Sequence, residues 1–101
     1  MKDEILSSIA ALDWQKAQPR KISVRIDGHA TSISLEEAYI DILLREAEAQ
    51  GLSFAGLVTC VDEARPAGVN LSASLRLFAF ELAQHSKAYP PRLVSGYHYL
   101  K

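Results

Sequence analysis

Residues 21–35 read KISVRIDGHATSISL, and this stretch decides the fold. Polar and apolar residues alternate on both sides of Asp27-Gly28, and β-branched residues are frequent, which predicts strands over 21–26 and 30–35. Asp-Gly is a favoured dipeptide for the two-residue type I′ turn that joins antiparallel strands. The stretch therefore predicts a β-hairpin with residues 27 and 28 at its tip.

The two-residue turn sets the pairing of the strands, from Ile26 opposite His29 to Ile22 opposite Ile33. Directly paired residues share a face of the sheet. The apolar face then carries Ile22, Val24, Ile26, Thr31, Ile33 and Leu35, and the polar face carries Lys21, Ser23, Arg25, Ala30, Ser32 and Ser34. Because a slip of one residue would turn Ile33 and Leu35 outward, we expect this register to be firmly set.

Apolar residues at helical spacing flank the hairpin and predict four helices. The expected ranges are 3–17, 36–50, 54–65 and about 71–85. The expected boundary residues are Pro19 after the first helix, a Ser34–Glu37 capping box before the second, Gly51 after it, Ser53 before the third, and either Asn70 or Ser72 before the fourth. The predicted fold class is therefore α+β and mostly helical, with an N-terminal helical extension (1–19), a body (20–85) and a C-terminal tail (86–101).

The apolar residues of the helix over 36–50 cover more than one stripe of its surface. A helix with one solvent-exposed face and one face on its own core would need only one stripe. A chain of 101 residues is one domain of modest core, and such domains often complete their apolar burial by dimerising. We therefore expect a homodimer formed through strand 30–35 and helix 36–50. Its expected core is Ile33, Leu35, Tyr39, Ile42, Leu43, Leu57, Val58 and Val61.

Charge is unevenly distributed along the chain, although the net charge is only −1. Residues 20–35 hold three cations and one acid, residues 36–50 hold one cation and five acids, and residues 71–101 hold four cations and one acid. An anion-binding face is expected to involve the first of these segments. The N-terminus lacks a secretory pattern and the single cysteine, Cys60, excludes an intrachain disulfide, so we expect a cytoplasmic protein without a membrane span.

The segment from Thr31 to Ala64 resembles the ribbon-helix-helix proteins of the Arc, MetJ and CopG superfamily, in which a strand precedes two helices joined by a Gly-x-Ser turn. The strings Gly28-His-Ala-Thr-Ser-Ile-Ser-Leu-Glu36 and Asn70-Leu-Ser72 are similar to those of a bacterial family of predicted ribbon-helix-helix proteins. The resemblance covers about residues 21–83. It implies a homodimer that binds duplex DNA and regulates transcription, as a repressor or an antitoxin-like protein.

In such proteins the paired strands of two protomers enter the major groove, and a helix N-terminus holds a phosphate. The candidate base-contacting residues are Arg25, Ala30, Ser32 and Ser34, and the candidate phosphate-contacting residues are Arg20, Lys21, Ser53 and Phe54. Family members often carry a basic residue where this chain has Ala30. Our hypothesis is that Arg25, which lies opposite Ala30 on the same face, supplies the missing contact.

The extra strand 21–26 raises a question of size. A dimer of hairpins has four strands about 4.8 Å apart, whereas the major groove, about 12 Å wide, admits a two-stranded ribbon. Either the outer strand lifts away from the groove or the sheet stays outside it. A dimeric protein-interaction module that has lost DNA binding is therefore the alternative function.

Other reactive residue types form no pattern of a catalytic or metal site. The three histidines and Cys60 lack zinc spacing, and the chain has no phosphate loop or nucleophile elbow, so we expect no enzyme activity, metal or cofactor. His29 is expected to pack or hydrogen bond at the turn, Cys60 to be at least half-buried, and Trp14 to anchor packing. The tail holds three tyrosines and three cations, suited to DNA or a partner protein.

Overall fold

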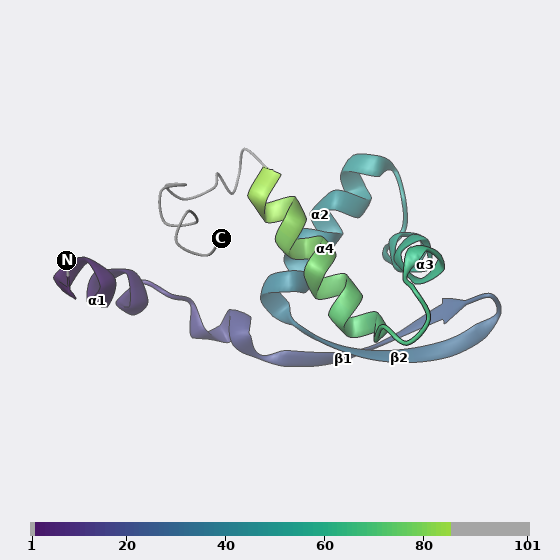
Figure 1. Ribbon diagram of the computed structural model, residues 1–101, viewed down its shortest axis with the longest axis horizontal. Coiled ribbons are helices and arrows are strands. Elements are labelled where there is room, and N and C mark those ends of the chain that lie inside the picture. The colour runs from purple at the N-terminus through teal and green to yellow at the C-terminus, as the bar shows by residue number, and fades with distance from the viewer. Residues whose placement is uncertain (1, 86–101) are drawn as a thin grey trace.

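A computed structural model of the protein describes residues 2–85, which form one two-stranded antiparallel sheet and four α-helices (Figure 1). The order along the chain is α1 (Lys2–Ala10), the 3₁₀ turn η1 (Trp14–Ala17), β1 (Pro19–Ile26), β2 (His29–Glu36), α2 (Glu37–Gln50), α3 (Phe54–Ala64) and α4 (Leu71–His85). The predicted fold class, α+β and mostly helical, is confirmed. The tail 86–101 lies outside the described residues.

The hairpin has the predicted turn and register. Asp27 and Gly28 both have positive φ, 52° and 80°, as a type I′ turn requires. Ile26 pairs with His29, Arg25 with Ala30 and Ile22 with Ile33, and the pairing continues to Pro19 and Glu36. Both strands are longer than the alternation predicted. β1 starts at Pro19, which was expected only to end a helix, and β2 extends by one residue at each end, to His29 and Glu36.

One face of the hairpin is buried under helices that all lie on the same side of it (Figure 1). α3 packs on β1, while α2 and α4 pack on β2 and on each other. The core of the described chain consists of Val24, Ile26, Ile33, Leu35, Leu43, Ala47, Leu57, Val58, Leu75 and Ala79. Since α4 supplies two of these residues, it belongs to the same core as the hairpin and the two preceding helices.

Two predicted helix boundaries are confirmed by hydrogen bonds. Gly51 ends α2 with a left-handed φ of 70°, and its N–H donates to the carbonyls of the last turn. The Ser53 hydroxyl caps α3 by accepting from the Gly56 N–H at 2.9 Å. At α4 the choice left open by the sequence is decided for Asn70, whose side-chain oxygen accepts from the Ala73 N–H at 3.1 Å.

The capping box expected at Ser34 is wrong. β2 runs through Glu36, so Ser34 lies in the strand, and Glu36 is the N-cap residue of α2 without a side-chain cap bond. The carboxylates at this junction instead bind cations from other elements: Glu36 pairs with Arg76 at 2.9 Å and Glu37 with Arg20 at 3.0 Å. These carboxylates therefore make contacts between distant segments rather than a local cap.

The single helix expected over 3–17 is also wrong. α1 ends at Ala10, and a separate 3₁₀ turn begins after Asp13, whose carboxylate accepts from the Gln15 N–H at 3.1 Å. This local cap competes with continuation of the helix. η1 is held against α2 by the Lys16–Asp41 ion pair, and the hydrogen bond that Lys16 donates to the Asp41 carboxylate raises the pKa of Lys16.

Candidate nucleic-acid interface

Within residues 2–85, no element covers the polar face of the hairpin. Its six side chains, which we call the outer face, are all exposed: Lys21, Ser23, Arg25, Ala30, Ser32 and Ser34. The helices lie on the opposite face (Figure 1). The outer face carries two cations, three hydroxyls and no acid. It therefore offers the hydrogen-bonding and electrostatic groups by which a sheet approaches a polyanion.

Arg25 lies next to Ala30 across the strands, as the register predicted. Its Nη1 donates to the Gly28 carbonyl at 2.8 Å, so the guanidinium is folded toward the tip of the hairpin. A guanidinium has five N–H donors, and this bond uses one of them. The hypothesis that Arg25 compensates for Ala30 required the two residues to be adjacent, and this adjacency is confirmed. A contact between Arg25 and DNA stays a prediction.

Arg20 and Lys21 do not share a face. Neighbouring residues in a strand point to opposite faces, so Arg20 lies on the helical side while Lys21 is on the outer face. Arg20 binds Glu37 at 3.0 Å, with 64% of its side chain still exposed. Arg20 is thus placed at the edge of the sheet rather than among the outer-face residues.

The start of α3 is the second predicted contact region. Ser53 is exposed and its hydroxyl oxygen caps the helix, while Phe54 is half-buried. The first N–H groups of a helix lack carbonyl partners within it and favour an anion, and the Ser53 hydroxyl retains its own hydrogen for donation. This end of α3 can therefore hold a phosphate through backbone groups.

The residues predicted for a dimer core divide into two groups. Five are already buried within one protomer: Ile33, Leu35, Leu43, Leu57 and Val58. The remaining Tyr39, Ile42 and Val61 are half-buried and pack at the margin of the core. A single protomer thus closes much of the core that the sequence suggested would need two, because α4 covers the inner side of β2. Their role in a dimer stays a prediction.

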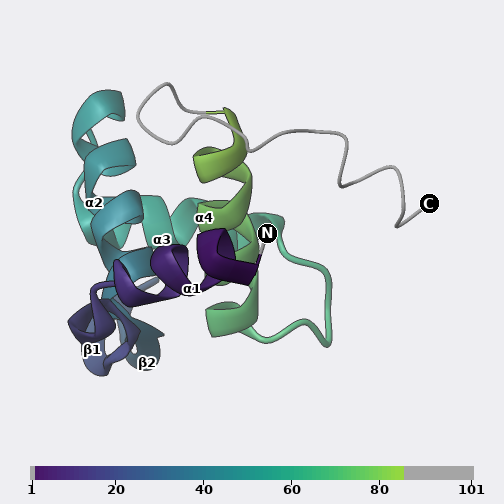
Figure 2. The same ribbon diagram turned by 90° about the vertical axis from the view of Figure 1, so that its left-hand side faces the viewer.

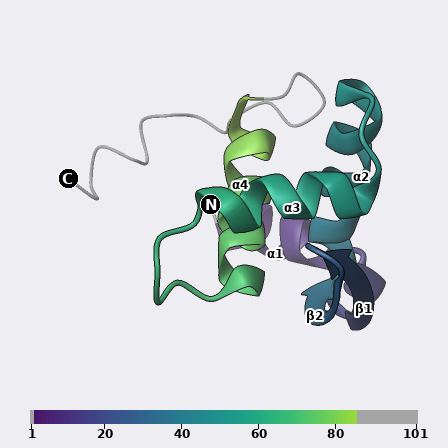
Figure 3. The ribbon, with the colours of Figure 1, turned by 90° about the vertical axis from the view of Figure 1, so that its right-hand side faces the viewer.

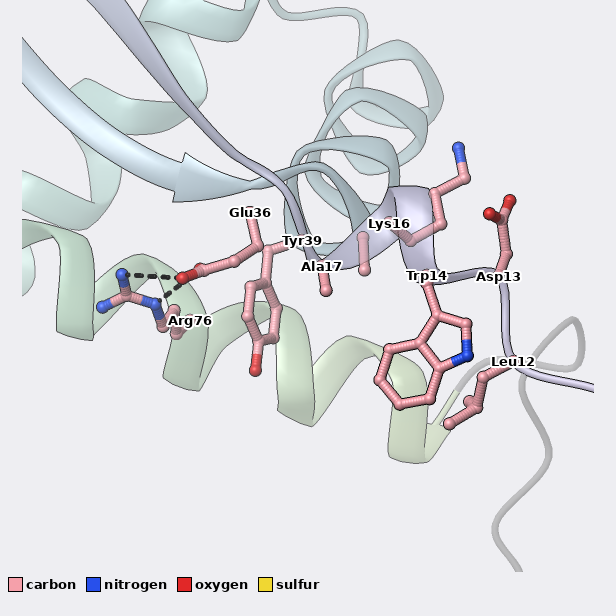
Figure 4. A pocket seen from close by; sticks show the side chains of 9 residues that line it. Leu12, Asp13, Trp14, Lys16, Ala17, Glu36, Tyr39 and Arg76 are labelled. Carbon is pink, nitrogen blue, oxygen red and sulfur yellow. Dashed lines mark hydrogen bonds and ion pairs between the residues drawn. The ribbon is translucent and has the colours of Figure 1, made fainter. Parts of the chain in front are cut away.

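The structure also shows a junction that sequence reasoning missed. Arg76 of α4 binds Glu36 at the end of β2, forty positions away, and its hydrogen bond lowers the pKa of Glu36. Figure 4 shows the hollow of about 410 Å³ beside this pair, with the Tyr39 ring and the indole of Trp14 at its walls. The only signal in the sequence was the two opposite charges, and nothing local pairs them.

Three expectations about single side chains are wrong. Trp14 is 63% exposed rather than a packing anchor, Cys60 is exposed rather than half-buried, and His29 is exposed at the tip of the hairpin. In the described part of the chain, no three His, Cys, Asp or Glu side chains lie together as metal ligands. Among residues 2–85, no helix has the length and apolar character needed to cross a membrane.

Comparison with known proteins agrees with this architecture. The family model of the ribbon-helix-helix domain matches residues 19–83, so the chain belongs to this family, which consists in general of DNA-binding regulators. No curated protein matches the chain. Among solved structures, it is similar to an uncharacterized protein from Bordetella pertussis Tohama I, with a TM-score of 0.69, 22% identity, and coverage of 87% of this chain and 79% of that chain. This likeness extends the shared fold beyond the matched domain.

Proposed function

We propose that the protein is a transcriptional regulator, a repressor or an antitoxin-like protein, that binds duplex DNA as a homodimer through the outer face of its hairpin. The observation that carries the proposal is the outer face itself: six exposed side chains with two cations and no acid, in a family of DNA-binding regulators. The acidic helix α2 lies on the other side of the sheet, away from this face (Figure 1).

The dimer forms through the free edge of β2. In residues 2–85 this strand pairs only with β1, so its other edge can pair with β2 of a second copy. The sheet order is then β1-β2-β2-β1, with the two copies of β2 as the central ribbon. This order addresses the question of width, because only the central ribbon needs to enter the groove.

Five of the six outer-face residues receive a role from their strand. Ser32 and Ser34 of β2 contact base edges, and Ala30 contacts a thymine methyl. Lys21 and Arg25 of β1 lie outside the central ribbon, toward the phosphates that border the groove. The start of α3, at Ser53 and Phe54, holds a further phosphate, and Arg20 at the sheet edge supports the same backbone contacts.

The test is selection of a binding sequence from random duplex DNA, followed by titration of the selected site at about 50 and 200 mM salt. Wild type is compared with Ser32→Ala, Arg25→Ala and the control Arg65→Ala, which removes a cation bonded to Asp62 on α3. We expect saturable, salt-sensitive binding that the control retains. Failure to select any sequence at the lower salt would refute the proposal.

The Arg25 variant separates two kinds of contact. If Arg25 binds a phosphate, Arg25→Ala weakens binding to all sequences alike and reduces the salt slope by about 1. If it binds a base, in place of the residue absent at Ala30, the loss is confined to one position of the site. Unchanged affinity would exclude both roles.

A protein-interaction module is the second candidate. It is favoured by the net charge of −1 and by the bonds of Arg20 to Glu37 and of Arg25 to Gly28, which occupy part of the basic surface. This second hypothesis predicts no DNA binding at low salt. It also predicts that a pull-down recovers a specific protein with the wild type but not with an outer-face variant such as Ser32→Asp.

A further inference from the structure

The N-terminal helix α1 is amphipathic, yet none of its residues is buried. Ile5, Leu6 and Ile9, together with Leu12 just beyond the helix, are each between 44% and 55% exposed. Hydrogen bonds from Ala11 to Ser7 and from Leu12 to Ile9 continue the helical path to Leu12. Ile5, Ile9 and Leu12 therefore line one side of an arm that projects from the body (Figure 1).

A helix this short is not stable by its own backbone bonds. Isolated helices below about 12–15 residues are marginal in water, so their stability comes from packing of an apolar face. α1 has nine residues, and nothing among residues 2–85 buries any of them. The described part of the protomer therefore leaves the apolar side of α1 without a cover.

The body carries an apolar groove of matching character. It lies between α3 and α4, encloses about 640 Å³, and is lined by Leu57, Cys60, Val61, Val69, Leu77 and Phe78, among others. Leu77 and Val69 are 63% and 39% exposed, so the groove is open to solvent at these residues. Such a trough between two helices is the kind of surface that takes the apolar side of a third helix.

α1 lies away from the groove of its own protomer and is tied to the body by a short link. Only residues 11–13 link α1 to η1, and three residues span at most about 11 Å. The Lys16–Asp41 ion pair fastens η1 to α2. The molecule is 51 Å long, with α1 at one end and α3 toward the other: α1 stands in front in Figure 2, and α3 stands in front of it in Figure 3.

We propose that α1 of one protomer docks into the α3–α4 groove of a second copy of the chain, with Ile5, Ile9 and Leu12 as its anchors. The exchange is reciprocal. A stable interface buries about 1,200–2,000 Å² in total, more than one nine-residue arm offers, whereas a two-fold exchange contributes two arms and two grooves. Both surfaces carry charges of both signs at their borders: Arg65 and Glu81 flank the groove, and α1 has two acids and a lysine in its first turn.

The only cysteine of the chain makes the exchange measurable. Cys60 lines the groove and is exposed in a single protomer, so an arm docked over it slows its reaction with a thiol reagent. The experiment compares the alkylation rate of Cys60 in wild type, Ile9→Asp and the control Ser7→Asp, which puts the same charge on the opposite side of α1. Because α1 buries no residue, neither variant disturbs the body.

We expect slow alkylation in wild type and Ser7→Asp, and a rate at least about tenfold higher in Ile9→Asp. When the arm is docked, Cys60 reacts only after the arm opens, so the alkylation rate falls with the free energy of that opening. Sedimentation should show Ile9→Asp with a weaker dimer or a monomer. Equal rates in all three proteins would overturn the proposal. So would protection that survives Ile9→Asp but disappears when the chain is ended at His85, because the tail would then occupy the groove. DNA binding enters neither readout.

Discussion

Two short helices of this protein differ in what they pack against. α1 has nine residues and α3 has eleven, and both have apolar side chains at helical spacing. α3 starts at the Ser53 cap and buries Leu57 and Val58 in the body, whereas no residue of α1 is buried by the rest of residues 2–85. Periodicity therefore indicates that a helix face will be covered, and only tertiary structure shows whether the cover comes from the same chain.

The largest effect is expected from placing a charge in α3. Val58 is fully buried, so Val58→Asp puts an unpaired carboxylate into the core and should unfold the protomer, a loss above about 4 kcal/mol. Ile9→Asp makes a matched change in α1 and should leave the helical circular dichroism of the body intact. Thermal melting at low protein concentration measures both. Unfolding of the α1 variant would show that the arm packs on its own body.

A smaller loss is expected at α4. Leu75 is fully buried beneath this helix, and Leu75→Ala should lower the free energy of unfolding by about 2–5 kcal/mol in urea denaturation. His85→Ala, at the exposed end of the same helix, should change it by no more than about 0.5 kcal/mol. Equal, small effects at both positions would mean that α4 is an appendage like α1 rather than part of the core.

The caps allow a finer comparison. Ser53 accepts the Gly56 N–H, so Ser53→Ala should destabilise the protein by about 1 kcal/mol. Ser72 was an equal candidate from the sequence, but Asn70 caps α4, so Ser72→Ala should cost less. The midpoints of urea unfolding of the two variants measure this difference. A larger loss of stability in Ser72→Ala than in Ser53→Ala would contradict the assignment of Asn70 as the cap of α4.

The smallest effect concerns pH. The hydrogen bond from Arg76 holds the pKa of Glu36 below its ordinary value of 4.5. The folded state thus gains stability that is present above that value and lost as pH falls through the lower, folded pKa. Glu36→Gln should be less stable than wild type at neutral pH by at most about 1 kcal/mol, and the difference should shrink below pH 4.5. A difference that stays constant with pH would contradict the pairing.

Local chemistry explains what could be predicted from the sequence. The hairpin register follows from the Asp27-Gly28 turn and strict alternation, both of which act within a few residues. The ends of α2 and α3 follow from Gly51 and Ser53 for the same reason. The outer-face residues were predicted correctly as one exposed set because a two-residue period leaves no other arrangement.

Contacts between distant segments account for the errors. The Ser34 capping box is sound by local rules, but pairing with β1 extends β2 through Glu36, and Arg76 then binds the carboxylate. The exposure of Trp14 and Cys60 depends on where the arm and α4 lie, which a helical pattern cannot specify. Base and phosphate contacts remain predictions for the same reason, since they depend on a second molecule.

The separation of the two hairpin faces also bears on how such a protein can evolve. Ile33 and Leu35 are held by the core, while Ser32 and Ser34, which alternate with them along β2, are exposed and free of packing constraints. Substitutions at the two serines should therefore leave the folded state nearly unaffected, whereas substitutions at Ile33 and Leu35 should destabilise it. A lineage can drift in what its outer face recognises while its scaffold is inherited unchanged.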